Sequence, residues 1–212
     1  MKVIDPHIKG LHKAATLTGF QVMDAINPHD VIKVLNANGV SFVLVGAYGL
    51  VGWTKDPRAT EDVDLVIAAR HQKKAARHLL DEYPHLEAKD HEVVTRLADR
   101  ESGDVAIDLM KPNQPLYREV FKHTHPISTA KQQYRVPCLE MALAMKFAAM
   151  ISLTRSDEKK HMDAHDFIRM VRVNPEIDSD RLAALGELVY AGGGQEIAEK
   201  VRQVRAGETL RL

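Results

Sequence analysis

The chain has 212 residues, of which 45% are hydrophobic, so it can form one or two cores of ordinary globular composition. Its 29 Lys and Arg residues balance its 29 Asp and Glu residues, which excludes a global attraction to nucleic acid or anionic membrane. Cys138 is the only cysteine, which argues against an intramolecular disulfide. The sequence has no apolar run of about 18 residues, which argues against a membrane span, and its start after Met1 is polar, which argues against secretion. A cytoplasmic location is therefore expected.

The first 137 residues are predicted to form an α/β domain, a mixed twisted sheet flanked by helices. In chain order the pattern indicates a helix from Asn27-Pro28 to Asn38-Gly39, a strand at 40–45, a short helix at 47–53, a strand at 63–68, a helix at 70–82, and strands at 92–98 and 104–110 joined by a polar hairpin. Residues 11–26 are weakly amphipathic and stay unassigned. Beyond Pro112, the chain as far as Pro137 is expected to be irregular, apart from one short helix at 117–121.

From Leu139 onward the pattern changes to helices alone, at 139–153, 159–172, 179–190 and 194–205. Gly192-Gly193-Gly194 is interpreted as a helix break, because no strand precedes it as one would in a phosphate loop. We therefore predict two domains. Residues 1–137 form a catalytic domain with an N-terminal helical extension, residues 138–212 form a helical domain, and the active site is expected in the cleft between them.

Two acids separated by one apolar residue are the most informative feature of the sequence. Asp62 and Asp64 project to the same face of a strand, while Val63 turns toward the core. Asp108 lies inside a second apolar run, at 105–110, and joins the pair if the two strands are neighbours. Three convergent carboxylates are suited to bind Mg²⁺ and, through it, a nucleoside triphosphate.

Gly46 follows the first predicted strand and precedes a short helix. A residue without a side chain lets backbone amides approach phosphate oxygens, and the positive end of the next helix points to the same place. Phosphoryl and nucleotidyl transfer depend mainly on positioning and on neutralising phosphate charge. A strand, a glycine and a helix followed by an acid-x-acid strand supply both requirements.

These residues resemble the nucleotidyltransferase superfamily with a DNA polymerase β-like catalytic domain. Val45-Gly46-Ala47-Tyr48-Gly49 and the segment from Arg58 to Leu65 are similar to the pattern of minimal bacterial enzymes, in particular the abortive-infection type toxin nucleotidyltransferases. The likeness covers about residues 40–172. It extends through a set of downstream positions: Leu143, Lys146, Ala149, Arg155, Lys159, Asp163 and Asp166.

The resemblance implies a reaction and a set of roles. A nucleoside monophosphate would pass from an NTP to a hydroxyl or phosphate acceptor, with release of pyrophosphate and with two Mg²⁺ ions. The acceptor could be an RNA 3′ end, a protein or a small molecule, and an antitoxin-like protein is a possible partner. The implied residues are Asp62, Asp64 and Asp108 as metal ligands and catalytic groups, Gly46 and Ala47 at the nucleotide loop, Thr60 beside the metal or phosphate, and Lys146 reaching the triphosphate.

Three alternatives remain open at this point. Ala47 stands where the family has a second Gly or Ser, so the domain could be a degenerate binding or regulatory module of a toxin–antitoxin pair. Lys146 could be a lysine whose stem passes through a core helix while its charge reaches solvent. His161 and His165 share a helix face, as zinc ligands do, which would suit a metal hydrolase.

Overall fold

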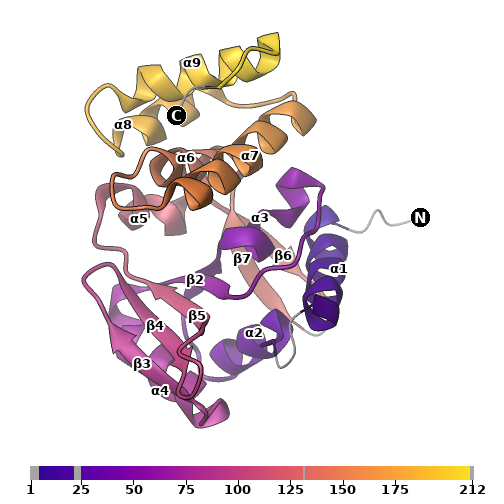
Figure 1. The fold of residues 1–212 in the computed structure, drawn as a ribbon, viewed down its shortest axis with the longest axis vertical. Coiled ribbons are helices and arrows are strands. Elements are labelled where there is room, and N and C mark those ends of the chain that lie inside the picture. Colours follow the sequence, from indigo (N-terminus) through magenta and orange to yellow (C-terminus); the bar gives the residue numbers. More distant parts are fainter. Residues whose placement is uncertain (1–4, 22–24, 131, 211–212) are drawn as a thin grey trace. The chain divides into compact units, whose positions relative to one another are not determined.

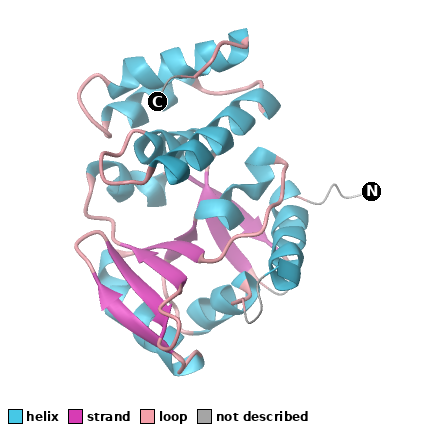
Figure 2. Cartoon of the chain, viewed as in Figure 1, coloured by secondary structure: helices cyan, strands magenta, loops and turns pink. Residues whose placement is uncertain are grey.

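The computed structural model describes residues 5–21, 25–130 and 132–210 (Figure 1). The chain divides into two compact units: residues 1–52 with 56–137, and residues 53–55 with 138–212. Within the described residues, all strands belong to the first unit (Figure 2). The mixed α/β class predicted from the sequence is therefore confirmed, and each unit is considered by itself below.

The first unit contains a five-stranded mixed sheet in the order β1-β2-β5-β4-β3. Only β2 and β5 run parallel among these neighbours, and β6 pairs with β7 in a separate antiparallel ribbon. The strands are β1 (Phe42–Leu44), β2 (Val63–Ile67), β3 (Leu86–Asp90), β4 (Val94–Asp99), β5 (Val105–Met110), β6 (Thr124–Ser128) and β7 (Gln133–Pro137). The helices are α1 (Pro6–Gln21), α2 (Pro28–Ala37), α3 (Gly46–Thr54), η1 (Ala69–His71), α4 (Gln72–Glu82), α5 (Pro115–Glu119) and η2 (Val120–Lys122).

One face of this sheet is covered by helices and forms the core. Alternate residues of β2 and β5 pack with apolar residues of α2 and α4, which lie against each other. The fully buried members include Ile32, Leu35, Leu65, Leu79 and Ile107. Because side chains alternate along a strand, the residues between Leu65 and its core neighbours point to the opposite face, where the polar site lies.

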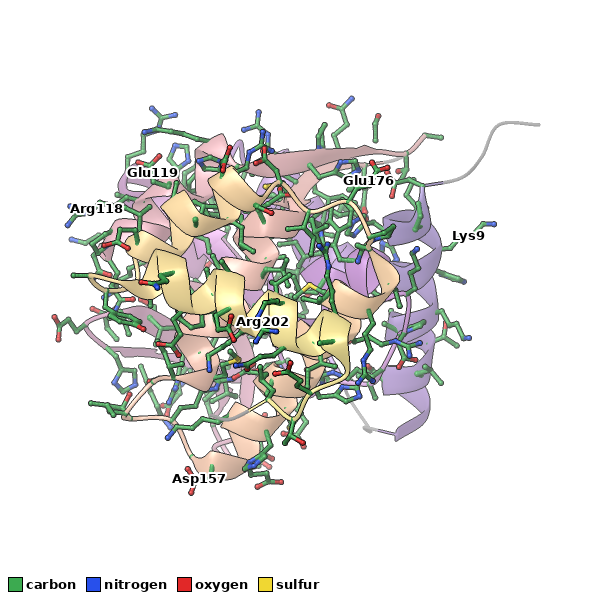
Figure 3. The ribbon with its side chains drawn as sticks, turned by 90° about the horizontal axis from the view of Figure 1, so that it is seen from above. Lys9, Arg118, Glu119, Asp157, Glu176 and Arg202 are labelled. Atoms are coloured by element: carbon green, nitrogen blue, oxygen red, sulfur yellow. The ribbon has the colours of Figure 1, made fainter. Side chains whose placement is uncertain are left out.

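The sequence explains where α2 begins and which side of α1 is buried. Asn27 caps α2, because its side chain accepts a hydrogen bond of 3.0 Å from the His29 amide, and Pro28 occupies the first turn. Helix α1 buries one stripe of residues at helical spacing, whereas Lys9 points away from the helix (Figure 3). The buried stripe consists of His7, Gly10, Leu11, Ala14 and Thr18.

The expectation of an irregular segment from residue 113 to Pro137 is wrong. Beyond α5 and η2, which meet the expected short helix, the segment contains the β6–β7 ribbon. Its strands were hidden because β6 contains Pro126 and buries Ile127 as its one fully apolar side chain. The strand at β3 was also missed, because most of its side chains are polar and exposed.

The second unit is helical, as predicted, with α6 (Leu139–Met150), α7 (Asp157–Val173), α8 (Ser179–Glu187) and α9 (Gly193–Ala206). Gly192 is the N-cap residue before α9 and has φ of +93°, so the triple glycine lies at a helix break. Arg202 lies on the exposed side of α9 and pairs with Glu199 and Glu208 (Figure 3). Among the helices of the described ranges, none is long and apolar enough to cross a bilayer.

Candidate active site

The three acids singled out from the sequence meet in the first unit. Asp64 in β2 lies directly opposite Asp108 in the parallel neighbour β5, and Asp62 precedes β2 by one residue. One carboxylate oxygen from each of the three lies within 4.8 Å of those of the other two. All three side chains are partly buried. The strand register therefore gathers three negative charges on the face of the sheet opposite its helices.

Gly46 fits against this acidic group because it has no side chain. The Val45 amide donates a 3.0 Å hydrogen bond to the Asp64 carbonyl, which brings the end of β1 beside β2. Gly46 has φ of +59°, and a Cβ built on it would lie 1.8 Å from Oδ2 of Asp64. Both the backbone conformation and the contact with the carboxylate therefore require glycine here.

A hydrogen-bonded chain holds the segment before Asp62. The Thr60 hydroxyl donates to Oδ1 of Asp62 over 3.1 Å, so Thr60 touches a predicted metal ligand. The Thr60 amide donates to the buried Thr18 hydroxyl of α1 at 3.3 Å, and the Tyr48 hydroxyl donates to the same oxygen at 2.9 Å. Helix α1, which the sequence left unassigned, thus positions the acidic loop, the segment from Thr60 to Asp62.

Arg96 is a site residue that the sequence reasoning missed. It lies in β4 opposite Asp108, and its Nε is 3.6 Å from Oδ1 of that residue. The pairing depends on a bulge between Leu97 and Ala98, which shifts the register by one residue. Without this shift Arg96 would face Ile107, whose side chain points to the core. The available sequence signal for this role was a charged residue, Arg96, among the apolar residues of β4.

Lys146 lies in α6 of the second unit, where it is buried with two acids of α7. Its Nζ is 2.8 Å from Oδ1 of Asp163 and 2.7 Å from Oδ2 of Asp166. Burial alone lowers the pKa of Lys146, but the carboxylates of Asp166 and Asp163 outweigh it and raise the pKa above its usual value. The lysine is therefore charged, and its ammonium lies inside the unit rather than extending to solvent.

The substitution Lys146→Met is expected to destabilise the second unit strongly. It would remove the cation that the two buried carboxylates share and leave Asp163 with Arg155, whose Nε lies 2.5 Å from its Oδ2; breaking a buried pair costs about 3–5 kcal/mol in comparable sites. Chemical denaturation followed by circular dichroism would measure the loss. The exposed Lys159 of the neighbouring helix is a matched control, and Lys159→Met should change stability by less than about 0.5 kcal/mol. Equal midpoints for the two variants would contradict this account of the buried pair.

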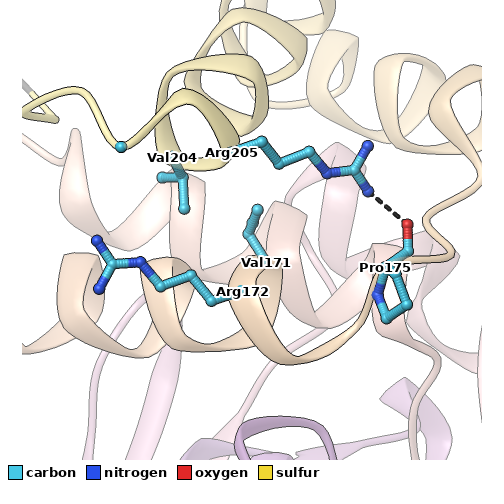
Figure 4. Close-up of a pocket in the computed structure, with 6 residues that line it drawn as sticks. Val171, Arg172, Pro175, Val204 and Arg205 are labelled. Atoms are coloured by element: carbon cyan, nitrogen blue, oxygen red, sulfur yellow. Dashed lines mark hydrogen bonds between the residues drawn. The ribbon is translucent and has the colours of Figure 1, made fainter.

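Two other features of the second unit, a pair of histidines and a pocket, offer no group suited to catalysis. Among the described residues, the groups able to hold a metal include neither His161 nor His165, which are both exposed, so the structure does not support the alternative of a metal hydrolase. A pocket between α7 and α9 is lined by apolar residues and two arginines (Figure 4). Arg205 donates to the Pro175 carbonyl at 2.7 Å, and none of the lining residues is an acid or a nucleophile.

The chemistry of the acidic group fits a hard divalent cation. Its donors are all carboxylate oxygens, which Mg²⁺ prefers over nitrogen or sulfur. Arg96 offsets part of the negative charge of Asp108. Asp62, Asp64 and Asp108 are thus brought together as expected, with Gly46 and Thr60 beside them.

A family model described as "Nucleotidyl transferase AbiEii toxin, Type IV TA system" matches residues 34–211. Among curated proteins, no sequence match was found. A solved structure of an antigenic nucleotidyltransferase-like protein from Paracoccidioides brasiliensis is 19% identical, with 95% of each chain covered and a TM-score of 0.50. The solution structure of the antibiotic-resistance factor ANT(2″)-Ia is 8% identical, with 85% of this chain and 95% of that chain covered and a TM-score of 0.50. The lincomycin-bound lincosamide antibiotic adenylyltransferase LnuA is 16% identical over 66% of this chain and 92% of that chain, with a TM-score of 0.46.

Proposed function

The chain belongs to the AbiEii nucleotidyltransferase toxin family, and we propose that it moves a nucleoside monophosphate from an NTP to a hydroxyl or phosphate acceptor in a Mg²⁺-dependent reaction that releases pyrophosphate. The observation that carries the proposal is the in-register pair of Asp64 and Asp108 with Asp62 within 4.8 Å. Three carboxylates this close repel one another, and a bound cation would relieve that repulsion.

The acids have distinct tasks in this proposal. Asp62 and Asp64 hold the cations, and Asp108 completes the set on the acceptor side, where it accepts the proton of the attacking hydroxyl. When bound, Mg²⁺ neutralises charge on the triphosphate and favours ionisation of the acceptor hydroxyl. Gly46 and Ala47 begin α3, so their backbone amides are suited to contact phosphate oxygens.

Three further side chains are assigned supporting roles in binding the metal and the triphosphate. Thr60 fixes the orientation of Asp62 through its hydroxyl, and Arg96 places a guanidinium beside Asp108. Lys146 is proposed to contribute a positive charge to the phosphates. The charge of this ammonium is maintained by Asp163 and Asp166, which raise the pKa of Lys146.

A transfer assay tests the proposal. The protein is incubated with each α-labelled NTP, Mg²⁺ and, in separate reactions, total RNA, lysate protein or an aminoglycoside. We expect label to appear in one acceptor class with equimolar pyrophosphate, and the signal to disappear when EDTA replaces Mg²⁺. Transfer that persists without divalent metal would contradict the assigned chemistry, and label in one class alone identifies the acceptor.

One residue favours a second candidate, a catalytically degenerate binding or regulatory module with an antitoxin-like protein as its partner. Ala47 offers a backbone amide but no hydroxyl to the nucleotide, so it removes one possible contact with the nucleotide and leaves the metal ligands unchanged. The variant Asp62→Ala separates the two candidates. If growth inhibition in cells persists after Asp62→Ala has abolished Mg²⁺-dependent NTP binding, the regulatory function is favoured; loss of both supports the enzyme.

A further inference from the structure

A second group of potential metal ligands lies in the first unit, and it combines nitrogen with oxygen. Asp5, His7 and His125 each offer one ligand atom, and these atoms lie within 4.8 Å of one another. The ring centroids of His7 and His125 are 5.5 Å apart, and Nε2 of His125 is 2.9 Å from Oδ2 of Asp5. Nothing in the transfer reaction proposed above uses these side chains.

Local structure holds two of the three donors firmly in place. Asp5 precedes α1, and its Oδ1 accepts a 2.8 Å hydrogen bond from the His7 amide, which leaves Oδ2 directed at His125. The His7 ring is 3% exposed and lies on Gly52, where an added Cβ would be 2.3 Å from ring atoms. The backbone of α3 therefore makes room for an imidazole at this position.

The accessibility of the cluster suits metal binding. The side chains of Asp5 and His125 are 29% and 37% exposed, which gives an ion a route from solvent. Ligands at about 2.1 Å from one ion lie roughly 3.4 Å apart in a tetrahedral site, a distance that small side-chain rotations can reach.

We propose that Asp5, His7 and His125 form a binding site for a divalent transition metal ion of the Zn²⁺ class. Two imidazoles and one carboxylate are ligands that Zn²⁺ accepts with an open fourth position, and they select against Mg²⁺, which prefers oxygen. The site differs in chemistry from the group of Asp62, Asp64 and Asp108, so the two can be loaded separately.

The metal would fasten the start of α1 to β6, because Asp5 and His7 come from the helix end and His125 comes from the strand. At its other end α1 carries Thr18, whose hydroxyl accepts the Thr60 amide hydrogen beside the acidic group. Loading the site should therefore stabilise the first unit and hold the helix that positions the acidic loop. The site thus has a structural role.

Direct metal binding tests the proposal without any activity measurement. Full-length protein is stripped with a chelator, titrated with Zn²⁺ by calorimetry and analysed for retained metal after desalting. We expect about one tightly bound Zn²⁺ per chain in the presence of excess Mg²⁺, and a rise in melting temperature of roughly 5–10 °C at saturating Zn²⁺. Co²⁺ loading should give visible absorption bands typical of imidazole and carboxylate ligation.

Four variants complete the test. His125→Gln and Asp5→Asn should each weaken Zn²⁺ binding by at least about tenfold, and Asp5→Asn keeps the oxygen that caps α1. His123→Gln, two residues away, should bind as the wild type does. The double variant Asp62→Asn/Asp64→Asn should also retain Zn²⁺. Wild-type affinity in His125→Gln, loss of Zn²⁺ in the double variant, or no binding to the wild type would each overturn the proposal.

Discussion

Nucleotide transfer by the variant Asp64→Asn is expected to be at least about a thousandfold slower than transfer by the wild type. Asparagine has nearly the same shape as aspartate but no charge, so the metal ligands lose one of three negative charges. A metal ion supplies several kcal/mol of transition-state stabilisation in such reactions, and about 4 kcal/mol corresponds to a thousandfold in rate. Initial rates of pyrophosphate release at saturating NTP measure the effect.

A matched control tests whether the loss of a carboxylate charge elsewhere in the first unit has the same effect on the rate. Asp104 is exposed in the hairpin that precedes β5 and belongs to neither metal-binding group, so Asp104→Asn should keep the wild-type rate. In metal-free buffer, Asp64→Asn should be as stable as the wild type or more stable, because it relieves repulsion within the group. Marked destabilisation of Asp64→Asn would instead assign a structural role to this residue.

The substitution Gly46→Ala is expected to disable the site by displacing the Asp64 carboxylate. Its Cβ would lie 1.8 Å from Oδ2 of Asp64, so the carboxylate must move away from its partners. A displacement of about 1 Å can cost a hundredfold in rate, and we expect Mg²⁺-dependent NTP binding and transfer both to fall by that factor or more. Calorimetric titration with Mg²⁺ and a non-hydrolysable NTP reports the binding loss.

Gly39 provides the control for backbone strain. It has φ of +58°, almost the same as Gly46, but a Cβ there would meet nothing within 4 Å. Gly39→Ala should therefore lose about 1–2 kcal/mol of stability from the left-handed conformation alone and keep normal Mg²⁺ and NTP affinity. Equal losses of affinity in both alanine variants would show that strain, rather than displacement of Asp64, disables the site.

Much of the site was predictable because its signals are local in sequence. The acid-x-acid spacing of Asp62 and Asp64 fixes their common face by the alternation of a strand, and Gly46 marks the end of β1. The apolar runs around them were long enough to indicate strands. The helical second unit was equally clear, because its apolar residues recur at helical spacing over long segments.

The features that were not predictable depend on register and on long-range pairing. A single bulge in β4 decides whether Arg96 faces Asp108 or the core, and no residue type identifies that bulge in advance. His7 and His125 are separated by more than a hundred residues, and β6 carries little hydrophobic signal. Their meeting requires the β6–β7 ribbon, an element whose sequence shows no clear strand pattern.

Asp62, Asp64 and Asp108 are proposed to bind the metal used in nucleotide transfer. Crystals grown with Mn²⁺ and a non-hydrolysable NTP test this proposal most directly, because Mn²⁺ replaces Mg²⁺ at oxygen ligands and scatters anomalously. We expect anomalous density bounded by the three carboxylates and in contact with the triphosphate. Triphosphate bound with its Mn²⁺ elsewhere, and no anomalous density at these acids, would contradict the account.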